Sequence, residues 1–360
     1  MNISADRSKS PGRNPLPAML VALAACVAAA PAKAEDYFKG KQVRILIGTP
    51  PGGGYDAYGR LVGRHIADFI PGKPGIIITN MPGASGIKLA NYLYSVAPKD
   101  GTTFAIFNKS MPFYERIGHG GIQYKSVDFS WIGSLSQAPD VVSVWHTAGV
   151  STIDQARKQE IILGADSGGG TMSAYPLLLN ATVGTRFRIV QGYEGGNAVD
   201  LAMEKGEVQG RGSNPWESWK TTRPNWVKQR LVRPLVQVGL KRDVDLPDVP
   251  LLMELATTDE QRQMFRLVSA PIGMERPFAA PPGVPVAVRD ILRDAFFSMT
   301  QDKEFLADAE KLNMGIDAQG GEAVEKIVAE VIGAPDAVVQ KVKAITSPGD
   351  SHGAAAPEAK

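Results

Sequence analysis

Short apolar runs that alternate with helix-like stretches are the feature that most limits the fold of this 360-residue chain. Each run is about as long as one strand, and the residues after it repeat apolar side chains with a period close to that of a helix. The runs lie at residues 43–48, 75–79, 102–107, 131–135, 141–145, 161–165, 188–191, 207–211 and 235–239. This alternation predicts an α/β protein with parallel-rich sheets and helices on both faces.

The N-terminus has the three parts of an export signal. Arg7, Lys9 and Arg13 precede an apolar run over residues 16–30, and small residues surround Lys33 up to Ala34. This order is that of a signal peptide, and the run is shorter than the roughly 20 residues that span a bilayer. We expect residues 1–34 to be cleaved after Ala34 and the protein to be periplasmic.

Cys26 leaves a second possibility open. Residues 23–26 read LAAC, which resembles a lipobox, so the chain could instead be a lipoprotein anchored at Cys26. Cys26 is the chain's one cysteine, and in either case the folded part has no thiol. Disulfides, zinc–cysteine sites and cysteine nucleophiles are therefore excluded.

The charge balance of the exported part argues against large anionic partners. The whole chain has 39 Lys+Arg and 37 Asp+Glu, of which residues 1–34 hold four and one, so the remainder has 35 against 36, or −1. No basic excess points to nucleic acid or to an anionic membrane. A small solute is the expected partner, and the length predicts two domains followed by a tail without fixed structure over residues 347–360.

A bare loop joins the first predicted strand to the first helix. Residues 50–54 read PPGGG, in which the prolines end the strand and the glycines let a ligand approach the backbone. Free amides at the start of the following helix attract anions. Asp56 either caps this helix by accepting first-turn amide hydrogens or contacts the ligand, and the sequence leaves both roles open.

Two nucleotide-binding motifs fit this loop poorly. A Walker loop requires Gly-Lys-Ser/Thr, which is missing. The spacing of Gly52, Gly54 and Ala57 satisfies a relaxed dinucleotide fingerprint, but the next predicted strand leads into Thr79 and Asn80 where an acid should hold the ribose. We expect no cofactor.

A second loop of the same design follows the strand at 161–165. Residues 166–171 read DSGGGT and precede a helical stretch from Met172. Ser167 does not lie in a Gly-x-Ser-x-Gly motif, and no histidine or second acid stands at a catalytic spacing from it or from Asp56, so an exported hydrolase is disfavoured. Two such loops about 115 residues apart indicate one anion clamp from each of two closing domains.

Four segments in order resemble the receptors of tripartite tricarboxylate transporters, known as TctC-like or Bug proteins. Residues 47–56 read IGTPPGGGYD where the family has VPFPPGGxxD, and residues 80–86 read NMPGASG where it has NxPGAxG. Residues 97–103, APKDGTT, and 278–285, FAAPPGVP, match two later family segments. The resemblance covers nearly all of the exported chain.

The resemblance implies a two-domain, type II periplasmic-binding-protein fold of the Venus flytrap kind. Domain 1 would comprise residues 36–137 and 266–346, and domain 2 residues 138–265. Members bind a small organic acid, such as a di- or tricarboxylate, through backbone amides and water, and deliver it to integral-membrane transporter subunits. We therefore expect a monomer that has no enzyme activity and binds no metal. A sensory receptor would use the same clamp, and the sequence does not separate the two.

The family pocket maps onto both glycine loops and three further positions. By position, the expected ligand-binding residues are Gly52, Gly53, Gly54, Tyr55, Asp56, Asn108, Ser167, Gly168, Gly169, Gly170, Thr171, Tyr193 and Asn214. The chain departs from the family pattern at Thr49, Tyr55, Ala174 and Glu194, which puts the identity of the acid in doubt more than its class.

Other conspicuous residues receive structural roles. His65 shares a helical face with apolar residues and is expected in the core, and no histidines show metal-ligand spacing. Arg211 is expected at the surface, with pairing to a solute carboxylate as the alternative. Trp216 and Trp219 are expected to pack in the second domain rather than to close over a ligand.

Overall fold

The computed structural model describes residues 37–166, 170–346 and 353–355. Within these residues the strands form two six-stranded sheets, whose orders are β11-β4-β10-β3-β1-β2 and β12-β7-β6-β8-β5-β9. We call each sheet with the helices packed on it a lobe. The strands of the first lobe are β1 (Gln42–Ile47), β2 (Gly75–Asn80), β3 (Thr103–Ile106), β4 (Ser130–Ser136), β10 (Glu275–Ala280) and β11 (Gln319–Gly320).

The second lobe is built from the middle of the chain and a short C-terminal strand. Its strands are β5 (Asp140–Trp145), β6 (Ile161–Gly164), β7 (Phe187–Gln191), β8 (Gly210–Pro215), β9 (Val232–Val238) and β12 (Gly353–Ala355). β12 lies in the segment predicted as a tail and pairs in parallel with β7. The strands divide between the sheets as the two-domain prediction requires, and the domain boundaries themselves stay a prediction.

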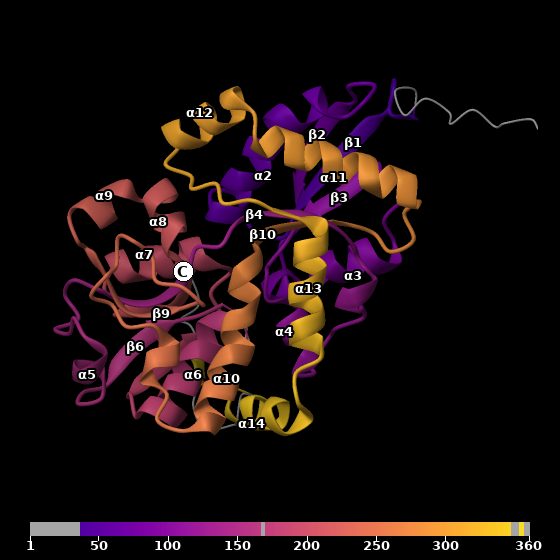
Figure 1. The fold of residues 1–360 in the computed structure, drawn as a ribbon. Helices are drawn as coiled ribbons and strands as arrows, with labels where there is room; N and C mark the ends of the chain where they lie inside the picture. The colour runs from indigo at the N-terminus through magenta and orange to yellow at the C-terminus, as the bar shows by residue number, and fades with distance from the viewer. Residues whose placement is uncertain (1–36, 167–169, 347–352, 356–360) are drawn as a thin grey trace, which may run out of the picture. The chain divides into compact units, whose positions relative to one another are not determined.

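Helices follow most strands, as the alternating pattern predicted (Figure 1). The helices are α2 (Gly54–His65), α3 (Ile87–Ser95), α4 (Met111–Arg116), α5 (Ile153–Ala156), α6 (Thr171–Val183), α7 (Gly196–Glu204), α8 (Trp216–Thr222), α9 (Pro224–Lys228), α10 (Asp259–Ser269), α11 (Val286–Thr300), α12 (Lys303–Lys311), α13 (Gly321–Ile332) and α14 (Asp336–Thr346). The predicted helix at 56–69 is α2 followed by a short 3-10 turn, Ile66–Asp68.

Both sheets are mixed rather than wholly parallel. β1 runs parallel to β2 and β3, and β6 runs parallel to β7 and β8. Two other strands run in the opposite direction to their neighbours. β10 is antiparallel to β3 and β4, and β5 is antiparallel to β8 and β9. The parallel pairs set α2 after β1 and α6 after β6, so each of these helices starts at the carboxyl end of a strand.

The predicted strand at 207–211 was placed too early. β8 runs from Gly210 to Pro215 and is buried throughout, although its sequence, GRGSNP, has low strand propensity. Close packing explains the glycines, because a side chain at Gly212 would meet Pro176 of α6 at 2.7 Å. Tertiary packing therefore overrides local preference here, while the apolar residue Val208 lies in the turn before the strand.

The chain crosses between the lobes more than once. Residues 137–139 join β4 to β5, and the segment containing α10 leads from β9 back to β10. α13 then packs on β4 and α4, and α14 packs on α6 and α10, as Figure 1 shows for the orange and yellow segments. One apolar core, which includes Trp131, Val236, Phe265, Val328 and Val339, is continuous through these segments.

Candidate functional site

The first glycine loop is held by its own helix. Pro50 and Pro51 end β1, and Gly52 has φ +85°, a conformation that glycine adopts without steric cost. Gly53 is the N-cap residue of α2, which begins at Gly54. The first amides of a helix have no acceptor within the helix, so this end of α2 offers donors to a bound group.

Asp56 stabilises this loop by reaching backwards. Its Oδ2 accepts the amide hydrogen of Gly52 at 2.9 Å, its carboxylate accepts from Nε of Arg60 at 3.0 Å, and its Oδ1 accepts from Nδ2 of Asn80 at 2.8 Å. Burial alone would raise the pKa of Asp56, but these hydrogen bonds outweigh it and hold the pKa below 3.8. The predicted cap on the first-turn amides was therefore wrong in detail, because Asp56 holds the amide that precedes the helix.

Two residues of the first loop lie against the second lobe. The carbonyl oxygen of Pro51 accepts from Nδ2 of Asn197, which lies at the start of α7, at 3.2 Å. A side chain at Gly54 would meet a guanidinium nitrogen of Arg276 at 2.8 Å and would overlap Ser218. The loop is thus wedged against α7 and α8.

Tyr55 joins the loop to the interior. Its Oη accepts the amide hydrogen of Lys109 at 3.3 Å, and the guanidinium carbon of Arg276 lies 4.3 Å from the centre of its ring. Burial and the nearby Glu275 carboxylate raise the pKa of Tyr55. The tyrosine stays neutral and acts as a packing and hydrogen-bonding group.

The second loop starts at Asp166 and ends at α6. Residues 167–169 lie outside the described residues, so the predictions for Ser167, Gly168 and Gly169 have no structural outcome. Gly170 is the N-cap residue of α6, and the amide of Thr171 donates to Oη of Tyr114 in the first lobe at 3.1 Å. Oγ of Ser85, also in the first lobe, donates to Oδ2 of Asp166 at 2.9 Å.

Asn108 completes this junction from the first lobe. Its Nδ2 donates to the carbonyl oxygen of Ser85 at 3.3 Å and to Oη of Tyr114 at 3.4 Å, while its Oδ1 accepts from the amide of Ser110. Asn108 therefore orients the two first-lobe groups that meet the second loop. We call Ser85, Asn108, Tyr114, Asp166 and Thr171 the Asp166 junction.

Tyr193 and Asn214 belong to the second lobe, where Tyr193 is partly buried and Asn214 is buried. Tyr193 packs near Gly164 of β6, and its buried Oη has no hydrogen-bond partner. Asn214 is buried in β8, where its Nδ2 donates to the carbonyl oxygen of Pro215 at 3.0 Å. Their assignment to the ligand site stays a prediction.

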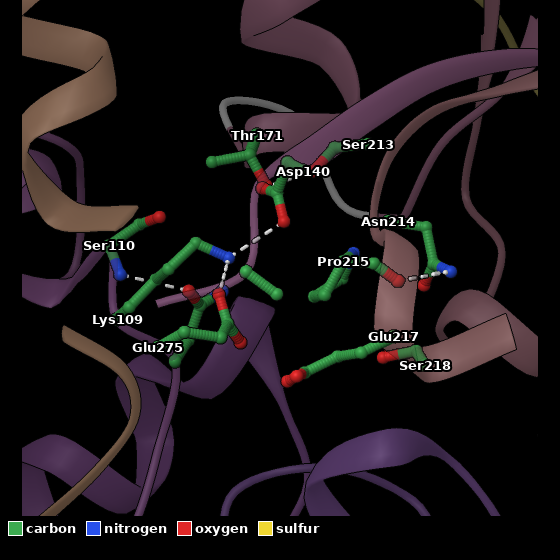
Figure 2. A network of polar contacts seen from close by, with 12 residues as sticks. Lys109, Ser110, Asp140, Thr171, Ser213, Asn214, Pro215, Glu217, Ser218 and Glu275 are labelled. Carbon is green, nitrogen blue, oxygen red and sulfur yellow. Dashed lines mark hydrogen bonds and ion pairs between the residues drawn. The ribbon is translucent and has the colours of Figure 1, made fainter. Parts of the chain in front are cut away.

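A buried charge network that the sequence analysis missed joins the lobes. Nζ of Lys109 lies 2.8 Å from Oδ1 of Asp140, and it also pairs with Glu275. Figure 2 shows Lys109 reaching between these two carboxylates. Asp140 opens β5 directly after the first crossing, whereas Glu275 opens β10 directly after the second.

Arg276 forms the second half of this network. Its guanidinium pairs with Glu275, donates to Oγ of Ser218 at 2.6 Å and lies 3.5 Å from Oε1 of Glu217. Arg276 is fully buried and has φ +62°, a strained conformation that close packing maintains. Lys109 and Arg276 thus tie the first lobe to β5 and α8 of the second.

The three carboxyl groups of the network differ in their titration. Burial raises the pKa of Glu217, and it also raises the pKa of Asp140 despite the nearby Lys109. The pKa of Glu275 is lowered, because Lys109 and Arg276 together outweigh its burial. Sequence offers one signal for this network, since Lys109 directly follows the predicted site residue Asn108, but it does not show that Lys109 is buried.

The remaining candidates have structural roles. Arg211 is buried rather than at the surface, its guanidinium lies 3.0 Å from Oδ1 of Asp200, and its pairing with a solute carboxylate stays a prediction. Trp216 and Trp219 pack in the second-lobe core, as predicted. His65 packs on Phe305 and bonds Asp308 at 3.0 Å.

The described residues hold neither a membrane-spanning helix nor a cluster of metal-ligating side chains. None of the helices in that part of the chain is long and apolar enough to cross a membrane. Nor do its histidine, cysteine, aspartate and glutamate side chains form a group of three or more that could hold a metal ion.

Comparison with known proteins places this geometry in context. No family model matches the chain. A UPF0065 protein of Cupriavidus necator is 26% identical over 324 residues, which cover 88% of this chain and 92% of the relative.

Solved structures share the fold at lower identity. The Rhodopseudomonas palustris protein MatC with bound malate has a TM-score of 0.64, with 18% identity over 84% of this chain and 99% of its own. R. palustris Rpa4515 with adipate has a TM-score of 0.66, with 19% identity over 84% and 97%. The periplasmic binding protein BugD has a TM-score of 0.67, with 16% identity over 85% and 98%. The chain therefore has the fold of a periplasmic binding protein, and over most of its length it is similar to the TctC-like or Bug solute-binding proteins.

Proposed function

We propose that this protein is an extracytoplasmic receptor that captures a small carboxylate-containing solute between its lobes and delivers it to a tripartite tricarboxylate-type membrane transporter. The observation that carries the proposal is the direct contact of both glycine loops with the opposite lobe. The first loop meets α7 and α8 through Pro51 and Gly54, and the second loop's Asp166 and Thr171 meet Ser85 and Tyr114.

Backbone donors would bind the solute carboxylate. Gly53, Gly54 and Tyr55 lie at the start of α2, where amides lack helical acceptors and the helix dipole favours an anion. The cations nearby are already engaged, because Arg60 pairs with Asp56, Arg211 with Asp200, and Lys109 with Asp140 and Glu275. A buried carboxylate needs several hydrogen bonds, and amides supply these without a free cation.

Known neighbours support the ligand class. Two solved structures of this fold hold adipate and malate, which are both dicarboxylates. The export signal predicted over residues 1–34, with cleavage after Ala34 or lipidation at Cys26, would place the receptor outside the cytoplasm. We propose that it binds as a monomer without turnover, in keeping with solute-binding rather than enzymatic neighbours.

A thermal-shift and calorimetry screen tests the binding step. Residues 35–360 would be titrated with adipate, malate, citrate, 2-aminoadipate, aspartate and a neutral sugar. A solute that binds the folded state at 100 times its Kd raises the free energy of unfolding by about 2.7 kcal/mol, so the melting temperature rises. If no acid shifts it while the sugar does, the proposed ligand class is wrong.

Uptake measurements test the delivery step. A strain that lacks this chain should lose uptake of the radiolabelled solute identified in the screen, and expression of the chain should restore it. Unchanged uptake combined with a lost transcriptional or chemotactic response would instead assign the protein to sensing.

A further inference from the structure

Five buried charged groups form one row across the two lobes. Lys109 lies between Asp140 and Glu275, and Arg276 lies between Glu275 and Glu217. The end groups, Asp140 of β5 and Glu217 of α8, belong to the second lobe, whereas the three middle groups belong to the first. All five side chains are at most 4% exposed. The row of charges therefore joins the lobes at both of its ends.

The charges in this row do not balance. Three carboxyl groups stand against two cations, so the row carries a net charge of −1 when every group is ionised. A net charge in an interior that excludes water is unfavourable, and one bound proton removes it. Asp140 is well held as an anion, because it accepts hydrogen bonds from Lys109 at 2.8 Å and from Ser213 at 3.0 Å. Glu217 at the other end has fewer donors.

Glu217 is a second-lobe residue whose partners lie mostly in the first lobe. Figure 2 shows its side chain extending from α8 towards Glu275. Its Oε2 accepts from Oγ of Ser136 at 2.7 Å, but its buried Oε1 has no hydrogen-bond partner. Arg276 lies 3.5 Å from Oε1 and donates its hydrogen bonds to Glu275 and Ser218 instead. One oxygen of the Glu217 anion thus lacks a donor.

Tyr58 of α2 makes the site suitable for a neutral carboxyl group. Its side chain interacts with Glu217, and its Oη donates to the carbonyl oxygen of Gly315 at 2.9 Å. Because that hydroxyl hydrogen is engaged, the oxygen of Tyr58 can act as an acceptor. A protonated Oε1 of Glu217 would supply the hydrogen, which an ionised Oε1 cannot.

The other charged groups on α8 and on the elements packed against it, which are α2, α9 and β8, have partners elsewhere or are exposed. Asp56 pairs with Arg60, Arg64 and His65 with Asp308, Arg211 with Asp200, and Lys220 with Asp245, while Lys228 is exposed. Glu275 and Arg276 of β10 therefore act on Glu217, the first against its anion and the second in its favour. Burial outweighs Arg276, so the pKa of Glu217 lies above 4.5.

We propose that Glu217 is a proton-dependent latch, which holds a proton while the two lobes are in contact and favours their separation when it loses that proton. This inference goes beyond the proposed function, because it concerns the lobes without a solute. In separated lobes water would reach Glu217, and its pKa would return to the ordinary value of 4.5. The contribution of Glu217 to lobe contact is therefore complete below pH 4.5 and is lost as the pH rises through the raised pKa.

Small-angle X-ray scattering tests the latch without a solute. We expect the radius of gyration of the exported chain, residues 35–360, to increase as the pH rises above 4.5. Glu217→Gln should keep the small radius at every pH, because its amide can donate to Tyr58 while still accepting from Ser136. Glu204→Gln removes the same charge at an exposed position of α7 and should follow the wild type.

Infrared difference spectra identify the proton itself. A neutral carboxyl group has a C=O band that a carboxylate lacks, so the wild type at the small radius should show such a band that is lost in Glu217→Gln. A missing band, or expansion of Glu217→Gln at every pH, would show that Glu217 acts as an anion paired with Arg276 and would overturn the proposal.

The wild-type profile alone can also refute the latch, so its test does not depend on a folded variant. A radius that does not change with pH would overturn the proposal. Equal expansion of the wild type and Glu217→Gln would assign the proton to another group, such as Asp140, whose pKa is also raised by burial. Each of these results leaves solute binding untouched, which the thermal-shift screen tests separately.

Discussion

Asp56 and Asp166 stand beside the two glycine loops, yet their surroundings are opposite. Asp56 accepts hydrogen bonds from Gly52, Arg60 and Asn80, and its pKa lies below 3.8. Oδ2 of Asp166 accepts a hydrogen bond from Ser85, its Oδ1 has no hydrogen-bond partner, and its pKa is raised by burial. An aspartate beside a glycine loop thus has donors for both carboxylate oxygens in one lobe, and a donor for only one of them in the other.

The number of hydrogen-bond donors around each carboxylate determines whether it mainly stabilises its loop or can still bind a further donor. A carboxylate whose oxygens all have donors fixes the backbone around it and offers little to a ligand. A carboxylate with one oxygen unsatisfied gains free energy from a new donor. The hydrogen bonds of Asp56 therefore fix the first loop in the ligand-free protein, and under the proposed function its amides would be preformed for a solute.

The largest expected effect is the loss of the Asp56 carboxylate. Asp56→Ala removes the acceptor for the Gly52 amide, Arg60 and Asn80, so the free energy of unfolding should fall by about 3 kcal/mol. Urea unfolding of residues 35–360 measures this, with Asp248→Ala as the exposed control. A loss below about 1 kcal/mol would mean that the loop keeps its conformation without Asp56.

Overpacking of the first loop gives the next largest effect. A side chain at Gly54 would overlap Ser218 and crowd Arg276, so Gly54→Ala should lower the free energy of unfolding by about 2 kcal/mol. Gly53→Ala is the matched control, because its added carbon would meet no atom within 4 Å. Equal stability of the two variants would show that the loop is not wedged against α8.

Solute binding by the same pair sharpens this result. Sequence reasoning predicts that alanine at Gly53 or Gly169 hinders the solute, and the open space around Gly53 makes a clean test of that prediction. Reduced affinity in Gly53→Ala with unchanged stability would place the solute against Gly53. Gly169 lies outside the described residues.

The local structure of the first glycine loop could be predicted from the sequence, whereas the ion pairs and hydrogen bonds between distant residues could not. The apolar run before Pro50 and the glycines after it predict a strand, a bare loop and a helix, because each depends on local conformational preference. The pairing of Asp56 with Arg60 also follows local helical spacing. In contrast, Asn80 reaches Asp56 only because β2 lies beside β1.

Contacts between the lobes could not be inferred from local patterns. Lys109 reads as a polar residue after a strand, but the crossings at Asp140 and Glu275 enclose it. Asp166 likewise resembles Asp56 in sequence, and only the placement of Ser85 shows which of its oxygens is satisfied. The protonation of these groups depends on their burial and on ion pairs with residues far away in the sequence. Neither can be inferred from local sequence patterns.

The pH dependence of the free energy of unfolding should change in opposite directions when Asp166 and Asp56 are replaced. The pKa of Asp166 is raised in the folded state above its ordinary value of 3.8. The contribution of Asp166 to the free energy of unfolding therefore falls as the pH rises from 3.8 through the raised folded pKa. Asp166→Asn should therefore become more stable relative to the wild type as the pH rises above 3.8. Asp56 has a lowered pKa, so its contribution is complete above 3.8 and is lost as pH falls through the folded pKa. Asp56→Asn should accordingly lose stability relative to the wild type as the pH rises towards 3.8 from the lowered folded pKa. Parallel pH profiles for both variants in urea unfolding would contradict the comparison.

The smallest expected effect tests the hydrogen bond that joins Asp166 to the first lobe. Ser85 has φ +52°, which costs a residue with a side chain about 1 kcal/mol and costs glycine little. Ser85→Ala loses the hydroxyl and keeps this strain, whereas Ser85→Gly loses the hydroxyl and relieves it. We expect Ser85→Ala to be less stable than the wild type by about 1 kcal/mol, and Ser85→Gly by about 0.5 kcal/mol or less. If both variants match the wild type at pH 7, the bond to Asp166 contributes nothing in the ligand-free state. The contacts of Tyr114 with Thr171 and of the first loop with α7 and α8 would then be the ones that hold these surfaces of the two lobes together.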